Sequence, residues 1–167
     1  IKWPNDILIR ERKVAGILIE LPIVAPGVGS ARRSGEVQLG SRPVIVGIGV
    51  NVNIKNFPPE LQHTATSIAL AIGQSVAVSE VESALLSSLD RWYSKYIKEG
   101  FESVMNMWTN YDCTVGRKIR IDLDGRTIDG TVEQVRTVSG DIVVRCSDGT
   151  IVALSAGDIL LDERLPD

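Results

Sequence analysis

The chain has 167 residues, of which 44% are hydrophobic and 23% are charged, and its formal net charge is −3. This length suits one domain, or one moderate domain with a small appendage, that buries its own core. No apolar run approaches the roughly 18 residues of a membrane span, and the slightly negative charge leaves no electrostatic footprint for polyanions. The composition predicts neither a membrane protein nor a nonspecific nucleic-acid binder.

Two cysteines and one histidine limit the metal chemistry open to the chain. Cys113 and Cys146 lie far apart without Cys-x-x-Cys spacing, and His63 has no histidine partner, so known ligand patterns give no zinc site. Two cysteines beside an adequate core are most simply reduced thiols, and no charged-then-apolar leader is present. We therefore expect a cytoplasmic protein, with His63 as an ordinary loop residue.

The first part of the chain predicts a β-hairpin. Residues 5–10 and 13–21 are rich in Ile, Leu and Val, as strands buried on both faces are. A Trp-Pro-Asn-Asp turn precedes them, and polar turn residues beside a buried hairpin are frequent binding groups.

The composition of residues 23–42 is dominated by Gly, Ser, Ala and Arg, which predicts a long loop. Its Arg32 and Arg33 are most simply solvated charges.

Residues 43–53 predict a strand that runs into a segment with alternating glycines, Gly47-Ile48-Gly49-Val50-Asn51-Val52-Asn53. Such glycines clear one face of a strand, so a ligand or a neighbouring backbone can come close. From the spacing alone, a ligand site and tight packing against a helix are equally good interpretations.

Helical periodicity follows. Residues 64–67 can start a short helix that ends at Gly73. Ser79 and Glu82 have the spacing of a capping box and predict the start of a longer helix that Gly100 ends. A further short helix carries the pattern to Trp108. We expect its aromatic stripe to be core rather than a cofactor cage.

After Tyr111 the period becomes that of strands, which predicts a domain boundary near residues 110–112. Short alternating stretches from residue 117 to residue 154 are joined by Asp-Gly and Ser-Gly turns, a strong hairpin signal. This many hairpins in succession indicate a small all-β barrel.

The side chains with chemical potential are few. No Ser-His-Asp set, paired carboxylates or P-loop can be found by spacing, which argues against hydrolase and Walker-type nucleotide chemistry. The remaining candidates are polar residues near the predicted strands: Lys2, Asn5, Asp6, Lys13, Glu20, Asn51, Asn53 and His63.

Four motifs follow one another in the order found in the biotin protein ligases, which the chain closely resembles. They are Lys2-Trp3-Pro4-Asn5-Asp6, Lys13-Val14-Ala15-Gly16-Ile17-Leu18-Ile19-Glu20, residues 47–53 and Ala65-Thr66-Ser67-Ile68. The resemblance implies an α/β (α+β) fold: residues 1–110 form the second half of a mixed-sheet catalytic domain of the biotin/lipoate ligase type, and residues 111–167 form an SH3-like barrel. The family's Gly-Arg-Gly-Arg-type loop is absent, and residues 23–42 are longer than expected. We therefore expect a fragment that is inactive alone.

The resemblance also implies an activity. Biotin protein ligases form biotinyl-5′-adenylate and pyrophosphate from biotin and ATP, and then pass the biotinyl group to a lysine of a biotin carboxyl carrier domain. We therefore expect ATP with Mg²⁺ as cofactors, biotin as substrate and the carrier domain of acetyl-CoA carboxylase or a related carboxylase as partner. No nucleic-acid or membrane partner is expected from this part.

Matching the family's first motif makes Lys2 the catalytic residue, a cation that stabilises charge on the phosphoryl group in flight. Taken by itself, Lys2 is more simply a surface lysine whose stem lies on Trp3. The same motif implies that Asp6 contacts the metal, since Mg²⁺ favours carboxylate oxygen. An ordinary Asx turn at Asn5 and Asp6 is an equally good interpretation.

The later motifs imply the rest of the site. Gly16 and Ile17 would lie against biotin, and Lys13 would point toward the adenylate. Asn51 and Asn53 would face the nucleotide. Two other interpretations stay open: a non-catalytic module that binds a carrier domain, and a relative of the lipoate–protein ligases.

Overall fold

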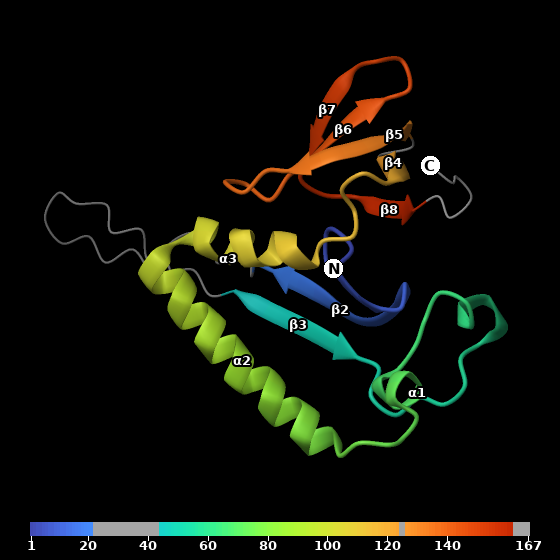
Figure 1. Cartoon of the computed structure of the whole chain (residues 1–167), viewed down its shortest axis with the longest axis vertical. Coiled ribbons are helices and arrows are strands. Elements are labelled where there is room, and N and C mark those ends of the chain that lie inside the picture. Colours follow the sequence, from blue (N-terminus) through green and yellow to red (C-terminus); the bar gives the residue numbers. More distant parts are fainter. Residues whose placement is uncertain (22–43, 124–125, 162–167) are drawn as a thin grey trace, which may run out of the picture.

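The computed structural model describes residues 1–21, 44–123 and 126–161. Within this part, two antiparallel β-sheets and a pair of packed helices make up most of the fold (Figure 1). The predicted loop at residues 23–42, with Arg32 and Arg33, lies outside the described residues.

The first sheet has the strand order β1-β2-β3, with β1 (Asp6–Ile9), β2 (Arg12–Glu20) and β3 (Ile45–Val50). The predicted hairpin is confirmed. Arg10 and Glu11 both have positive φ, the backbone conformation of a tight two-residue turn between antiparallel strands. The predicted mixed sheet has limited support: both ladders are antiparallel, and one isolated parallel bridge joins Lys13 to Ala65.

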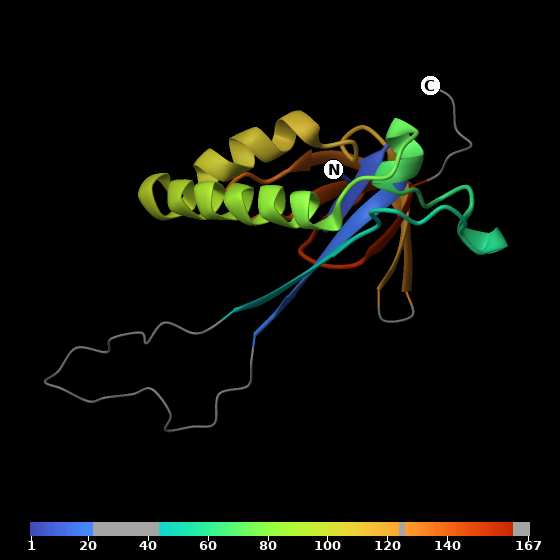
Figure 2. The ribbon, with the colours of Figure 1, turned by 90° about the horizontal axis from the view of Figure 1, so that it is seen from below.

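The prediction that these strands are buried on both faces is wrong for the residues that the structure describes. In β2 only Val14 and Ala15 are buried, and the outer halves of β2 and β3 extend beyond the helices in Figure 2. No described element covers their apolar side chains. The exposed apolar residues here are Leu18, Ile19, Leu21, Val44, Ile45 and Val46.

Three α-helices follow: α1 (Ile68–Ile72), α2 (Val78–Glu99) and α3 (Phe101–Trp108). The helix predicted to start near residues 64–67 is confirmed, because the Ser67 hydroxyl accepts a hydrogen bond from Leu70 N at 3.1 Å and Gly73 ends α1 in the left-handed conformation. The predicted capping box is wrong. Helix α2 begins after Ala77, so Ser79 already lies inside the first turn and caps nothing.

Helix α2 contains no buried residue, although its apolar side chains recur at helical spacing. Among the described elements, its extensive contacts are with α3 alone. A large apolar surface on α2 therefore faces solvent in this structure. Its exposed members are Val78, Leu86, Leu89, Tyr93, Tyr96 and Ile97.

The second sheet has the order β7-β6-β5-β4-β8 and is antiparallel throughout. Its strands are β4 (Lys118–Leu123), β5 (Arg126–Val135), β6 (Ile142–Cys146), β7 (Ile151–Leu154) and β8 (Asp158–Leu161). The predicted all-β unit is thus present, with β8 as an additional strand. Closure into an SH3-like barrel is not confirmed, because β7 and β8 are the two edges and no ladder joins them in the described ranges.

The main hydrophobic core lies on this second sheet, and residues from well before it contribute to the core. Trp3 and Met105 are buried in the same cluster as the sheet residues, and Trp108 packs against it. The predicted core role of the α3 stripe is confirmed in part, because Met105 and Trp108 join this core whereas Phe101 is exposed. The sheet residues of the cluster are Ile119, Ile121, Val132, Val135, Ile142, Val144, Leu154 and Ile159.

Candidate functional site

The first motif forms a closed turn. Lys2 N donates to Asp6 O at 2.9 Å and Asp6 N donates to Lys2 O at 3.0 Å, with the cis peptide Trp3–Pro4 between them. Lys2 is half-buried, and none of the described carboxylates forms an ion pair with its ammonium. The Lys2 charge is therefore available to a ligand.

Lys13, Asp6 and Gly16 form one unit on the hairpin. Lys13 Nζ lies 2.5 Å from Asp6 Oδ1, with side-chain exposures of 49% for Lys13 and 17% for Asp6. Asp6 and Gly16 are partners across β1 and β2. A Cβ atom at Gly16 would lie 3.2 Å from Lys13 Cε, so the glycine provides the space through which the lysine reaches the carboxylate.

This geometry bears on the metal predicted at Asp6. Mg²⁺ in proteins is held by one or two carboxylates together with waters and substrate phosphates. The Asp6 carboxylate is already paired with Lys13, and the described ranges hold no group of three His, Cys, Asp or Glu side chains that could bind a metal ion. These residues by themselves do not fit a resident metal site.

Asn5 fastens the turn to the second strand. Its Nδ2 donates to Ile17 O at 2.8 Å, and Ile17 N donates to Asn5 O at 3.0 Å. The turn is thus held in register with the part of β2 that carries Gly16. The Asn5 side chain therefore has a structural contact with β2, which differs from the Asx turn given as an interpretation of the sequence.

Asn51 and the fourth motif meet beside Lys13. Beyond the end of β3, residues 64–66 take the place of that strand along β2. Lys13 N donates to Thr64 O and Thr66 N donates to Lys13 O, both at 2.8 Å. Asn51 N donates to Val14 O at 2.8 Å and Asn51 Nδ2 donates to Thr66 O at 3.1 Å. Motifs far apart in the sequence are therefore joined around Lys13.

Asn53 behaves differently. Its Nδ2 donates to Val76 O at 2.8 Å, and its Oδ1 accepts from Val76 N at 3.1 Å. The amide group therefore fixes the segment that leads into α2. None of its hydrogen bonds connects it to Lys13, so the structure does not bring Asn53 together with the other predicted residues.

Thr66 is a residue that sequence reasoning did not single out. Its backbone N–H donates to Lys13 O and its carbonyl accepts from Asn51 Nδ2. Its side chain is fully buried, and its Oγ1 has no hydrogen-bond partner in the described part of the chain. Its place in the fourth motif was the one sequence signal for Thr66, but the burial of its hydroxyl depends on contacts with residues distant in the sequence.

The two remaining sequence candidates, Glu20 and His63, are both exposed.

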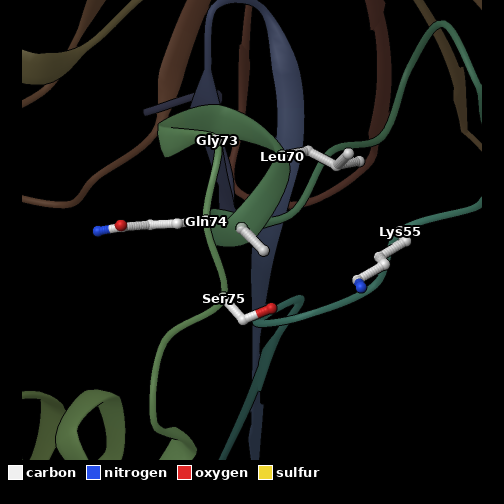
Figure 3. Close-up of a pocket in the computed structure, with 6 residues that line it drawn as sticks. Lys55, Leu70, Gly73, Gln74 and Ser75 are labelled. Atoms are coloured by element: carbon white, nitrogen blue, oxygen red, sulfur yellow. The ribbon is translucent and has the colours of Figure 1, made fainter.

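An open hollow of about 380 Å³ lies beside α1. In Figure 3 the Lys55 and Ser75 side chains lie on facing sides of it, whereas Gln74 points away. None of the predicted site residues lines this hollow. Its lining residues are Lys55, Ala69, Leu70, Gly73, Gln74 and Ser75.

Comparison with known proteins identifies relatives at the level of sequence. No family model matches the chain. It is 35% identical over 133 residues to the bifunctional ligase/repressor BirA of Bacillus subtilis (strain 168), which covers 78% of this chain and 36% of that protein. It is 32% identical over 122 residues to the biotin–[acetyl-CoA-carboxylase] ligase of Paracoccus denitrificans, which covers 71% of this chain and 45% of that protein.

The fold has solved counterparts. It is similar to the biotin protein ligase from Aquifex aeolicus in complex with biotin and ATP, with a TM-score of 0.73 and 23% identity over 97% of this chain and 61% of that chain. The chain spans less than half the length of the two curated relatives. None of the helices in the described ranges has the length and apolar character needed to cross a membrane. By its four motifs, its relatives and its fold, the chain belongs to the biotin protein ligase family.

Proposed function

We propose that the chain is part of an ATP-dependent ligase that joins biotin to a carrier protein. In the first step an oxygen of the biotin carboxylate attacks the α-phosphorus of ATP, the bond to pyrophosphate breaks, and biotinyl-5′-adenylate forms. In the second step the biotinyl group passes to a lysine of a biotin carboxyl carrier domain, with AMP as the leaving group. We take the carrier to be that of acetyl-CoA carboxylase or a related carboxylase.

One observation carries the proposal. Lys13 is the point at which the motifs meet, because Asp6 pairs with its ammonium, residues 64–66 bond to its backbone, and Asn51 bonds to both neighbouring segments. A packing role for each motif alone does not require this convergence. A shared ligand does require it, since binding groups must surround one place.

The chemistry of the first step suits the two lysines. The attacking carboxylate and the phosphate are both negative, so a fixed cation lowers their repulsion and stabilises charge on the phosphoryl group. We assign this role to Lys2, whose ammonium has no carboxylate partner in the described ranges. Lys13, held by Asp6, is proposed to face the adenylate.

The remaining contacts are assigned by position. Gly16 and Ile17 would lie against biotin, on the strand that also carries Lys13. Asn51 would face the nucleotide through its carbonyl oxygen, since its Nδ2 is bonded to Thr66 O. Asn53, both of whose amide atoms bond to Val76, would hold the adjoining segment in place rather than bind directly.

Mg²⁺ enters this proposal as the companion of ATP. Because Asp6 is paired with Lys13 and no three-ligand cluster surrounds it in the described ranges, we assign Asp6 to positioning Lys13. The ion would be held mainly by phosphate oxygens and water, and no step is derived through it.

The exposed apolar surfaces support the view that this chain is part of a longer enzyme. Monomeric soluble proteins rarely leave contiguous apolar patches this uncovered, and both α2 and the outer halves of β2 and β3 do so here. We propose that the rest of the protein covers them and that the chain alone is inactive. Residues 1–110 would then be the catalytic part, residues 111–167 an SH3-like barrel, and the protein cytoplasmic.

The test measures pyrophosphate release and biotinyl-adenylate formation with biotin and ATP. It compares this chain with a longer protein from the same gene. The longer protein should form adenylate, and Lys2→Met should slow it about 10²–10³-fold, as expected when one charge-stabilising group is lost. Lys118→Met, at an exposed lysine on β4, is the matched control and should leave the rate unchanged.

Other outcomes have distinct meanings. Full activity of Lys2→Met contradicts the role of Lys2. Binding of a carrier domain without pyrophosphate release favours the non-catalytic module, and activation of lipoate instead of biotin favours the lipoate–protein ligase relative.

A further inference from the structure

Both neighbours of Lys2 are hydrogen-bonded to the segment that leads into the second sheet. Cys113 N donates to Ile1 O at 2.9 Å. Trp3 N donates to Thr114 Oγ1 at 2.9 Å, and the Thr114 side chain is fully buried. The backbone that carries Lys2 is therefore held on both sides by residues more than 100 positions away.

The Trp3 side chain makes a second attachment to the same sheet. Only 4% of Trp3 is exposed, and its indole packs in the core of the second sheet. Its Nε1 donates to Gly140 O at 2.9 Å, in the turn between β5 and β6. The indole is thus anchored by apolar contact and by a hydrogen bond, and Figure 1 shows the N-terminal end of the chain between the two sheets.

Thr114 lies in a hydrogen-bonded segment that is attached to the second sheet. Its own N–H donates to Asp112 Oδ1 at 3.0 Å, and Val115 N donates to Asp112 Oδ2 at 2.9 Å. Two residues later, Gly116 N donates to Val132 O on β5 at 2.8 Å. The hydroxyl that accepts from Trp3 therefore belongs to a segment that is hydrogen-bonded within itself and attached to β5 two residues later.

A separate contact joins the sheet to the hairpin. Arg117 Nη2 lies 2.6 Å from Glu11 Oε1, at the turn between β1 and β2. The first motif and the hairpin turn thus both contact the short segment 113–117 that leads into β4. Such a pair of attachments limits rotation of the sheet relative to the Lys2 turn.

We propose that the second sheet positions the catalytic lysine, with Thr114 as the positioning residue that holds the Lys2 turn through Trp3. This inference rests on the function proposed for Lys2, and it gives the C-terminal unit a part in adenylate formation. A lysine side chain is flexible, so its useful placement depends on a fixed backbone. Small displacements of a reacting group can lower a rate by orders of magnitude.

The test uses Thr114→Val, which keeps the shape of the side chain and removes the hydroxyl. Thr114→Ser keeps the hydroxyl and should behave like wild type. Thr131→Val is the matched control, because Thr131 is a half-buried residue of β5 whose hydroxyl forms no hydrogen bond within the described ranges. All variants are made in the longer protein that forms adenylate.

Three measurements are made on each variant. In Thr114→Val, hydrogen exchange of the Trp3 amide should accelerate about 10-fold or more, because its acceptor is lost. Acylation of Lys2 by acetic anhydride, measured by mass spectrometry relative to Lys118, should become faster. The kcat for adenylate formation should fall on the order of 10- to 100-fold with a much smaller change in KM for ATP.

The outcomes separate this inference from the proposed function. Faster Trp3 exchange with unchanged Lys2 acylation and unchanged kcat overturns the positioning role, whether or not the ligase assignment holds. If the wild-type protein forms no adenylate, the proposed function fails, and the acylation of Lys2 still decides whether Thr114 positions it. If Thr114→Val does not fold, Thr114→Ala, which also removes the hydroxyl, replaces it in the same measurements, and an unchanged rate of Lys2 acylation overturns the inference.

Discussion

Replacing Gly16 by alanine should affect ligand binding at Lys13 much more than the free energy of unfolding. An added Cβ would lie 3.2 Å from Lys13 Cε, 3.3 Å from Lys13 Nζ and 3.6 Å from Asp6 Oδ1. The first two distances are tighter than ordinary van der Waals contact, so the lysine side chain must shift. Because about half of that side chain is exposed, it can move into solvent without displacing the strands.

The expected change in stability is small because two effects oppose each other. Weakening an ion pair this exposed costs about 0.2–1 kcal/mol, and removing a glycine from a strand interior gains about 0.5–1 kcal/mol. The free energy of unfolding should therefore change by less than about 1 kcal/mol in either direction. Binding should respond more strongly, because a displaced ammonium loses a charge-assisted hydrogen bond of about 1.5–3 kcal/mol, or about 10- to 150-fold in affinity for ATP.

The assay combines urea unfolding with isothermal titration of ATP in the longer protein. Gly47→Ala is the control for stability, since its Cβ would make ordinary contacts with Leu18 at 3.7 Å and 4.0 Å. Unchanged ATP affinity in Gly16→Ala would refute the assignment of Lys13. A loss of more than 2 kcal/mol of unfolding free energy, where about 1 kcal/mol is the limit expected, would refute the view that the lysine end can move freely.

Three further predictions concern the remainder of the fold. Gly130→Ala should lower the free energy of unfolding by about 1–3 kcal/mol, because its Cβ would lie 2.5 Å from the backbone oxygen of Arg145; a wild-type urea midpoint contradicts this. Thr66→Val should raise the free energy of unfolding by about 1 kcal/mol, because it removes a buried hydroxyl without a described partner; a lower midpoint in urea means that another group satisfies it. The Thr150 hydroxyl and backbone N–H hold the pKa of Asp148 below its ordinary value, so their stabilisation is present above that value and is lost as the pH falls through the lowered pKa. Thr150→Val should raise the Asp148 pKa in an NMR titration, and an unchanged pKa contradicts the hydroxyl's role.

Local patterns determined the elements that depend on neighbouring residues. The hairpin of β1 and β2 follows from two apolar runs around a charged turn, and α1 follows from Ser67 at its start and Gly73 at its end. The period-two pattern also predicted an all-β C-terminal unit. One local prediction was wrong: Ser79 and Glu82 have capping-box spacing, but the N-cap of α2 is Ala77, two residues before Ser79.

The order of the four motifs was enough to predict the family, because motif order is a property of the chain alone. Tertiary structure decided what each polar residue does. Asp6 pairs with Lys13, Asn53 holds Val76, and Trp3 of the first motif is buried in the second sheet beside Thr114. These contacts join residues whose separation reaches 111 positions, and no periodicity or spacing in the sequence specifies such a pair. They depend on how the sheets and α3 pack, because burial and hydrogen bonding over these distances arise only when the whole chain is folded.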